Sequence, residues 1–524
     1  MSAIKLYFDD FGANTVPGTT DMTSAFQAAL EAAEDGATIK CIPGTTYKIT
    51  DTTTVTNDNI TIDRTGATID ATELSLSLVQ ARPDSVFHVL GSARLETTLA
   101  ADAAKDAETI TVTSATGVQV GDPVWIESDG ELWYTEGANT VKRQIHNRVR
   151  SISGTTVTLC WPLDMSFDAT THTPVVHFWN CVKNFRMIGG RSYGGGPRND
   201  PDNPATYIGN GQGPADLFLE YVDGAHVQVD YIEGFQGYGI FPSKTMDVHI
   251  QGGTIRGHTD DYVDPVTLTP DVVEGRNSGF YGVFFSDSYG GSFRDCTGHR
   301  TRHMQDAGSA GNFLIQNLHA YGNHRPPFGS HNGATNFTFD SLFCGDGSGG
   351  IQWRGHHMNV NACTLRGRED SGAAVYDRPG AAADIPRDYI ITGNTLFGDR
   401  QALILEANIR SIKSSNNTYE AQQASFYPID IQTLDLDFAT FSNDLMVTVS
   451  LYCLYAQNTT PRTRSAISVS NCRMTGYTSA PARFFDTEVI QYRNNIVDAG
   501  DAIVHDSTNI VNTEANYGIG GETA

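Results

Sequence analysis

Short stretches of alternating apolar and polar residues, separated by glycine or small polar residues, run along most of the chain. Each stretch alternates, turns at a small polar residue and alternates again, which is the pattern of β-strands with one buried face. The clearest five begin at Phe313, Phe337, Met358, Tyr389 and Ser411, and their starts lie 24, 21, 31 and 22 residues apart. A strand pattern that recurs about every 22 residues predicts a β-solenoid, in which each coil buries its apolar face against its neighbours.

Similar stretches extend the repeat in both directions, beginning at Val227, Val248, Ile467 and Ile490. In three copies a cysteine directly follows the turn, at Cys296, Cys363 and Cys472. We therefore expect these three side chains to stack inside the solenoid. The eight cysteines are scattered singly, without the pairs typical of metal sites, which predicts free, buried thiols in a protein made in a reducing cytoplasm.

Two regions depart from the repeat. Residues 21–33, "DMTSAFQAALEAA", predict a helix that Asp21 or Thr23 can cap and whose apolar face contains Phe26. Residues 92–168 contain hairpin patterns such as "ETITVTSATGVQVGDPVWIESD" and predict a small inserted β subdomain. The predicted order is an N-terminal segment with a capping helix at 1–50, the first coils at 51–91, the insertion at 92–168 and the main solenoid at 169–524.

Composition argues against several classes of function. The formal net charge is −25 at pH 7, and no basic stripe exists to displace counterions, so we expect no nucleic-acid partner. No apolar run approaches the roughly 20 residues needed to cross a bilayer, and the start "MSAIKLYFDDFG" lacks an apolar signal segment. The runs "RNDPDNP" and "HTDDYVDP" group oxygen ligands without matching a calcium loop, so we expect no cofactor, with calcium as the alternative.

The N-terminal run "YFDDFGANTVPGTTDMTSAFQAALEAA" resembles the first segment of the pectate-lyase-like right-handed β-helix superfamily, where a capping helix precedes the first coil. Arg302-His303, followed by "GSH" at 329–331 and "GIQWRG" at 350–355, resembles the catalytic region of bacteriophage tailspikes and capsular polysaccharide depolymerases. One step departs from that pattern, because Gly329 stands where the family has an acid. The resemblance implies an all-β fold, a right-handed parallel β-helix with an N-terminal capping helix and a small β-rich insertion.

The same resemblance implies a homotrimer in the tail of a virion. Such a protein is made in the host cytoplasm, acts outside the cell during host attachment, and contacts other phage tail or baseplate proteins. Its expected substrate is a bacterial surface polysaccharide, and no membrane insertion is expected.

Histidine is concentrated in one part of the repeat: seven of the 15 histidines fall within residues 299–357. Residues one coil apart stack at the strand spacing, roughly 4.8 Å. His331 and Arg354 are 23 residues apart, 22 further residues lead to Tyr376, and one coil plus a loop leads back to His303. These four side chains are therefore predicted to form one outward column on consecutive coils.

This set of side chains suits β-elimination from a uronic acid. An arginine such as Arg354 beside the carboxylate stabilises the charge that develops when the C5 proton leaves. A neutral histidine, His331 or His303, takes that proton, since the unperturbed pKa of histidine is about 6.5. Tyr376 or the second histidine protonates the departing O4. We expect neighbouring anionic sugars to be held by Arg302, His324 and Arg325.

Hydrolysis is the main alternative, and it needs two carboxylic acids about 5 to 9.5 Å apart. Asp306 follows His303 by three residues and Asp377 adjoins Tyr376, so either acid could take a catalytic role on the same outward face. Two further acids near that face could line the substrate, Asp287 and Glu406. The residues also leave open a receptor-binding tail protein without turnover and a free bacterial enzyme of the pectate-lyase-like type.

Overall fold

The chain forms two compact units in the computed structural model, Met1–Phe313 and Leu314–Ala524. The structure describes residues 5–74, 84–136, 139–195, 214–235, 237–257, 280–323, 325–331, 333–345, 349–367, 373–377, 387–406, 409–433, 436–458, 466–485, 489–497, 503–505, 510–514 and 517–518.

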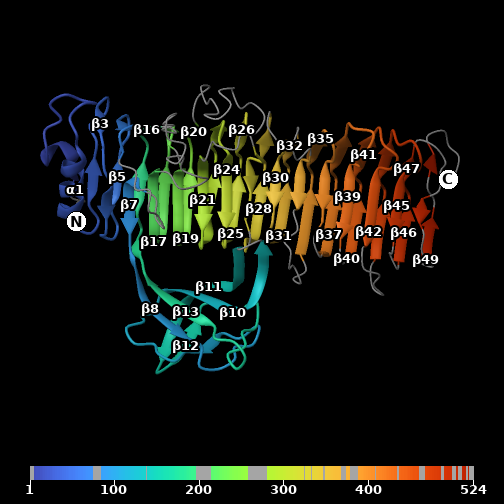
Figure 1. Ribbon diagram of the computed structural model, residues 1–524, viewed down its shortest axis with the longest axis horizontal. Helices are drawn as coiled ribbons and strands as arrows, with labels where there is room; N and C mark the ends of the chain where they lie inside the picture. Colours follow the sequence, from blue (N-terminus) through green and yellow to red (C-terminus); the bar gives the residue numbers. More distant parts are fainter. Residues whose placement is uncertain are drawn as a thin grey trace, which may run out of the picture. The chain divides into compact units, whose positions relative to one another are not determined.

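The first unit is built from coils whose strands pair in parallel with the equivalent strands of the next coil (Figure 1). One stack contains β4 (Thr53–Val55), β7 (Ser85–Leu90), β21 (Tyr281–Ser286) and β24 (His303–Gly308). A second contains β1 (Lys5–Tyr7), β2 (Thr38–Lys40), β5 (Thr61–Asp63), β14 (Val182–Lys183), β15 (Arg186–Ile188) and β22 (Tyr289–Arg294). The next strand of this second stack is β25 (Gly311–Gln316), which pairs with β22. The long strands β17 (Ala215–Gln228) and β19 (Tyr238–Gln251) run through both stacks. A third stack contains β3 (Thr46–Lys48), β6 (Thr68–Ala71), β16 (Arg191–Gly194), β18 (Tyr231–Glu233), β20 (Thr254–Arg256) and β23 (Thr297–His299).

Strand register puts apolar side chains of successive coils on top of one another. Ile39 pairs with Ile62, Ile62 with Met187, Met187 with Val227, and Val227 with Ile250. None of these side chains exceeds 1% exposure. Full burial of such a side chain stabilises the fold by about 1.5–3 kcal/mol, so the stacked columns form the core of the unit.

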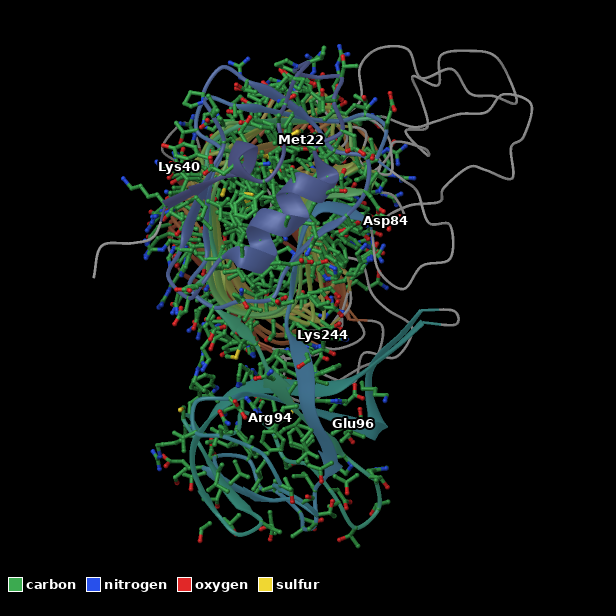
Figure 2. The ribbon with its side chains drawn as sticks, turned by 90° about the vertical axis from the view of Figure 1, so that its left-hand side faces the viewer. Met22, Lys40, Asp84, Arg94, Glu96 and Lys244 are labelled. Carbon is green, nitrogen blue, oxygen red and sulfur yellow. The ribbon has the colours of Figure 1, made fainter. Side chains whose placement is uncertain are left out.

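One helix closes the N-terminal end of the coils, as predicted. It is α1 (Thr23–Ala32), preceded by the 3-10 helix η1 (Phe8–Asp10). Figure 2 shows α1 lying across the end of the first coils. The Phe26 ring is fully buried and stacks on Phe8 with ring centroids 3.7 Å apart. Asp21 accepts a hydrogen bond from the Thr23 backbone N–H at 3.0 Å, which fixes the start of the helix.

The insertion is a six-stranded, mainly antiparallel sheet in the order β8-β13-β10-β11-β12-β9 (Figure 1). Its strands are β8 (Ser92–Thr98), β9 (Thr109–Thr111), β10 (Pro123–Glu136), β11 (Asn139–Ser153), β12 (Thr156–Leu159) and β13 (Val175–Asn180). The sheet therefore ends at Asn180, beyond the predicted boundary at 168. Its last strand, "VVHFWN", alternates like the solenoid strands, which is why the sequence pattern placed it in the main solenoid.

One face of the inserted sheet packs on the coils of the same unit. Arg148 bonds to Asp223 twice, at 2.5 and 2.8 Å, and reaches Asp247 at 3.3 Å. Trp179 lies edge-on to Tyr221 with ring centroids 5.9 Å apart. Lys244, labelled in Figure 2 on the side of the coils near the inserted sheet, lies 4.9 Å from the centre of the Tyr221 ring.

The second unit has three strand stacks, which we call sheets I, II and III. Sheet I contains β27 (Phe328–Gly329), β30 (Ile351–Trp353), β33 (Val375–Asp377), β36 (Leu403–Leu405), β39 (Ile429–Thr433), β42 (Leu454–Asn458), β45 (Ala482–Phe485) and β48 (Val504–His505). Sheet II contains β28 (Thr335–Asp340), β31 (His356–Asn361), β34 (Arg387–Thr392), β37 (Ile409–Ser415), β40 (Leu436–Ser442), β43 (Ala466–Ser470), β46 (Val489–Arg493) and β49 (Ile510–Glu514). Sheet III contains β26 (His319–Tyr321), β29 (Phe343–Cys344), β32 (Thr364–Gly367), β35 (Thr395–Gly398), β38 (Thr418–Ala421), β41 (Leu445–Thr448), β44 (Arg473–Thr475), β47 (Ile496–Val497) and β50 (Tyr517–Gly518).

Coils of the second unit pass from sheet II to sheet III through a turn with one left-handed residue, such as Asn416 at φ 57° or Asn443 at φ 55°. The next residue points inward, and at Asn394, Asn417, Asp444 and Asn495 its side chain accepts a hydrogen bond from the backbone N–H of the equivalent residue one coil earlier. The distances are 2.8 to 2.9 Å. We call this set the turn ladder: Cys363, Asn394, Asn417, Asp444, Cys472 and Asn495.

The predicted burial of the repeat cysteines is confirmed. Cys296, Cys363 and Cys472 are at most 2% exposed, and the latter two stand in the turn ladder. All eight cysteines are free thiols, but Cys160 is exposed, so the expectation that every thiol is buried was wrong at this position. It directly follows β12 in the insertion, outside the solenoid repeat. Within the described part of the chain, no helix is long and apolar enough to span a bilayer.

Candidate functional site

The outer face of sheet I brings together chemically active side chains from many coils. Alternate residues of its strands point away from the core, and the strand register aligns them from coil to coil. We call this alignment the first row: Gly329, Gln352, Tyr376, Ile404, Asp430, Tyr455 and Arg483. Two residues further along the same strands runs the second row: His331, Arg354, Glu406, Gln432 and Gln457.

His331 and Arg354 are neighbours in the second row. The pairs Phe328 with Ile351 and Gly329 with Gln352 set this register. The hydrogen bond from the Ser330 N–H to the Gln352 carbonyl, at 3.0 Å, extends it beyond the strand. The Ser330 hydroxyl also accepts the Arg354 backbone N–H at 3.1 Å, which fixes the backbone of the arginine. Both side chains are partly exposed, so this pair can meet a ligand.

Tyr376 does not stand in line with His331 and Arg354, so the predicted single column was wrong at this residue. Tyr376 pairs with Gln352 in the first row, because the coil from Gln352 to Tyr376 contains 24 residues rather than the 22 counted from Arg354. The two rows are about 6.6 Å apart at the usual strand rise. The Tyr376 hydroxyl nevertheless reaches across them and donates to Glu406 at 3.3 Å.

Asp377 is not on the outward face, so its predicted catalytic role is corrected. It pairs with Trp353, whose side chain is fully buried, and Asp377 itself is 0% exposed. Its carboxylate forms an ion pair with Arg387 and accepts the Tyr389 hydroxyl at 2.6 Å. Adjacent residues of a strand point to opposite faces, and the outward position of Tyr376 therefore forces Asp377 inward. Asp377 has a structural role inside the coil.

His303 and Asp306 belong to the first unit, whereas the two rows belong to the second. The His303 Nε2 lies 4.0 Å from an Asp306 carboxylate oxygen, and the two side chains are 6% and 2% exposed. The His303 ring stacks on Tyr281 at 5.4 Å, and the Arg302 guanidinium lies 5.6 Å from the centre of the same ring. Asp306 pairs with Phe284 on the neighbouring strand, and the Phe284 ring packs edge-on against Tyr281. These residues form a largely buried aromatic and ionic cluster rather than part of an open column.

Asp287 lies under the inserted sheet, which corrects the prediction that it adjoins the open face. The His146 Nε2 contacts the Asp287 carbonyl oxygen at 3.2 Å. Burial raises the pKa of the Asp287 carboxyl to about 6, although Ser286 donates to it. Burial lowers the pKa of His146 to about 4, so this histidine is neutral at pH 7. Asp287 therefore belongs to the contact between insertion and coils.

The remaining predicted substrate-binding residues are Arg325, partly exposed before β27, and His324, which lies outside the described residues. Both runs considered for calcium, 198–204 and 258–265, also lie outside them. In the described ranges, no three His, Cys, Asp or Glu side chains are grouped as metal ligands would be.

Sequence reasoning missed four side chains of sheet I: Tyr427, Asp430, Tyr455 and Arg483. Asp430 is 3% exposed and accepts hydrogen bonds from Gln432 at 3.0 and 3.1 Å and from Gln401 at 3.1 Å. Burial raises the pKa of Asp430 above its usual value despite these donors. The signal was present in "YPID", "YCLY" and "APAR", which align at this face once coil lengths of 25 and 28 residues are allowed.

Comparison with solved structures identifies the fold. The chain matches the tailspike gp61 of Pseudomonas phage phi297 with a TM-score of 0.57 and 15% identity, covering 99% of this chain and 81% of that one. It matches the tailspike gp49 of Pseudomonas phage LKA1 with a TM-score of 0.52 and 16% identity, covering 95% and 76%. The Gp54 tailspike of Acinetobacter baumannii bacteriophage AP22, solved with an A. baumannii capsular saccharide, matches with a TM-score of 0.52 and 12% identity, covering 98% and 77%. No protein-family profile and no curated protein matches the sequence. Together with the stacked parallel strands, these similarities confirm the predicted right-handed parallel β-helix.

Proposed function

We propose that the protein is a bacteriophage tail depolymerase that cleaves an acidic bacterial surface polysaccharide on the outer face of sheet I. The observation that carries this proposal is the alignment of His331 with Arg354 beside the Tyr376–Glu406 pair. The fold shared with three phage tailspikes supports it, one of which was solved with a capsular saccharide. In this proposal the chain assembles as a homotrimer on the virion tail and contacts phage tail or baseplate proteins.

The proposed reaction is β-elimination at a uronic acid. Arg354 pairs with the sugar carboxylate and stabilises the negative charge that develops next to it. Neutral His331 removes the proton from C5. The C4–O4 bond then breaks, a C4=C5 double bond forms, and Tyr376 gives its hydroxyl proton to the departing O4. The electron pair of the C5–H bond thus becomes the new double bond.

The spacing of the groups supports these roles. His331 and Arg354 are on neighbouring coils, about 4.8 Å apart at the backbone, so both can address one sugar ring. Tyr376 stands in the other row, about 6.6 Å along the strand, where the next glycosidic oxygen would lie. Its hydroxyl donates to the Glu406 carboxylate, which orients the phenol before the reaction. Glu406 is thereby a positioning residue.

Hydrolysis is a second candidate because of Asp430. Burial raises the pKa of this carboxyl, as a general acid at neutral pH requires, and Glu406 stands one coil earlier in the other row. In this reading Asp430 protonates the leaving oxygen and Glu406 acts as the base or nucleophile. Both reactions use the same face of sheet I and the same polysaccharide.

Analysis of the products separates the candidates. Elimination yields an unsaturated sugar end that absorbs in the ultraviolet, whereas hydrolysis yields only saturated ends and a new reducing group. We expect Arg354→Ala and His331→Ala to abolish the ultraviolet signal. Arg410→Ala is the matched control, since Arg410 is an exposed arginine paired with Asp388 on sheet II, and it should leave turnover intact.

Three results would change the conclusion. Saturated ends that disappear in Asp430→Asn assign the reaction to hydrolysis. Polymer that stays intact while the protein still binds it makes the chain a receptor-binding tail protein. A monomeric mass in solution contradicts the proposed trimer.

A further inference from the structure

Three tyrosines and an arginine gather on the last coils of sheet I, away from Tyr376. We call them the tyrosine shelf: Tyr427, Tyr452, Tyr455 and Arg483. The Tyr427 and Tyr455 rings are stacked, with centroids 4.8 Å apart and planes 17° from parallel. The Arg483 guanidinium lies 5.5 Å from the centre of the Tyr452 ring and donates to its hydroxyl at 3.3 Å.

The shelf arises from a contact that repeats from coil to coil. Tyr427 and Tyr452 occupy the bend just before their strands, and each touches the first-row residue of the following coil. Gln401, at the same bend one coil earlier, likewise donates to Asp430 at 3.1 Å. Side chains from the bend and from the first row thus form one continuous surface over four coils.

The exposure and charge of the shelf suit a ligand better than a structural role. Tyr427, Tyr455 and Arg483 are partly exposed on the side of the sheet that faces away from the core. The Tyr455 hydroxyl donates to Gln457 at 2.7 Å, so the ring is held in place without being covered. The chain carries a net charge of −25, so most of its surface repels anions. Arg483, which lies among the aromatic rings, attracts an anion locally.

We propose that the tyrosine shelf is a second saccharide-binding site that holds a carboxylate-bearing sugar of the polysaccharide, apart from the sugar that is cleaved. The apolar face of the sugar ring packs on the Tyr427–Tyr455 pair, and Arg483 pairs with the carboxylate. This proposal rests on the proposed function for its substrate class. It goes beyond that function by giving the protein a separate anchoring site.

The register gives the distance between the two sites. Tyr455 is three coils from Tyr376 in the first row, which corresponds to about 14 Å along the stack. One sugar ring cannot span that distance, so a chain bound at both places lies along the coils. The shelf then retains the polymer after a cut and favours attack within long chains over attack at their ends.

Affinity electrophoresis tests the shelf directly. The full chain is run in native gels containing alginate, polygalacturonate or hyaluronate, three polymers that carry uronic acids, or neutral dextran. We expect retardation by at least one uronate polymer and none by dextran. Tyr455→Ala and Arg483→Ala should each weaken the binding of that polymer roughly 10-fold.

Two control variants separate ligand contact from general damage. Tyr455→Phe keeps the ring and removes the hydroxyl that donates to Gln457, so binding should persist. Phe438→Ala removes an aromatic residue that is 40% exposed on β40 of sheet II, and it should have no effect. Unchanged circular dichroism of each variant excludes misfolding.

The possible outcomes decide the proposal independently of the catalytic one. Equal retardation of the wild type and Tyr455→Ala, or no retardation by any uronate polymer, overturns the shelf. Weaker binding by Tyr455→Ala, with product formation that depends on Arg354, supports both proposals. Weaker binding by Tyr455→Ala without any product supports the shelf and rejects the depolymerase.

Discussion

Asp444 is the one carboxylate of the turn ladder, whose other members are asparagines and cysteines, and Asp444→Asn therefore tests the physical account of the fold. Asp444 is 1% exposed and accepts hydrogen bonds from the Asn417 backbone N–H and side-chain amide at 2.8 and 3.0 Å, and from the Ser414 hydroxyl at 2.8 Å. Burial still raises the pKa of Asp444 from 3.8 to about 6. The charge is thus disfavoured in spite of its donors.

The size of the effect follows from linkage. A pKa raised by about 2 units corresponds to roughly 3 kcal/mol between the two protonation states. Because the folded-state pKa is the higher one, stability is fully present below about pH 4 and falls as the pH rises to about 6. Above that pH the wild type folds with an unfavourable buried charge.

Asp444→Asn removes this cost and keeps the ladder. The new amide oxygen accepts the Asn417 N–H, and the new amide nitrogen can donate to the Ser414 carbonyl. The preceding coil provides the precedent, because the side-chain amide of Asn417 donates to the Ile391 carbonyl oxygen at 2.8 Å. Ser414 pairs with Ile391 in the strand register and therefore presents its carbonyl at the equivalent place. We expect the variant to match the wild type at pH 3.5 and to be more stable by up to about 3 kcal/mol at pH 8.

Urea unfolding at both pH values, followed by circular dichroism, measures the difference. All other groups titrate equally in the two proteins, so their contributions cancel. Asn417→Asp is the matched control, because it places a second carboxylate in the ladder and should lose stability as the pH rises. If Asp444→Asn is less stable than the wild type at pH 8, the ladder donors stabilise the charge and the reasoning fails.

Three further substitutions test other contacts. Arg387→Met leaves the buried Asp377 carboxylate without its cation. We expect the free energy of unfolding, measured by urea titration, to fall by about 3–5 kcal/mol. An unchanged midpoint would mean that Asp377 is protonated in the folded protein. Gly291→Ala places a methyl group 1.9 Å from the Val248 carbonyl oxygen at φ 133°, so we expect a clear fall in Tm, and an unchanged Tm would contradict this packing. Arg148→Ala removes the bonds to Asp223 and should speed trypsin cleavage around the insertion; equal cleavage would show that the aromatic contacts alone hold the sheet.

The repeat could be predicted from the sequence because strand parity and turn chemistry are local properties. Asn416 and Asn443 adopt the left-handed conformation that small polar residues tolerate, and the residues after them point inward at a fixed place in each coil. The burial of Cys363 and Cys472 follows from that place. The helix at α1 was equally clear from its apolar face.

The site was harder to predict because coil length is set by loops. Tyr376 is shifted by two residues relative to the expected column, because the coil between Gln352 and Tyr376 is two residues longer than the 22 assumed. Unknown coil lengths also prevented prediction of the Tyr427–Tyr455 stack. Tyr427 lies in the bend before its strand, whereas Tyr455 lies within the strand of the next coil. Asp287 was misplaced for another reason, because the inserted sheet covers it.

The turn ladder also has a consequence for how such a protein can change over time. The four hydrogen-bonded pairs of ladder residues are separated by 31, 23, 27 and 23 residues, yet the hydrogen bond within each pair keeps nearly the same length. Extra residues are therefore accommodated elsewhere in the coil without disturbing the alignment of its neighbours. A lineage can therefore exchange or lengthen the outer segments one coil at a time while the alignment of the coils is inherited unchanged.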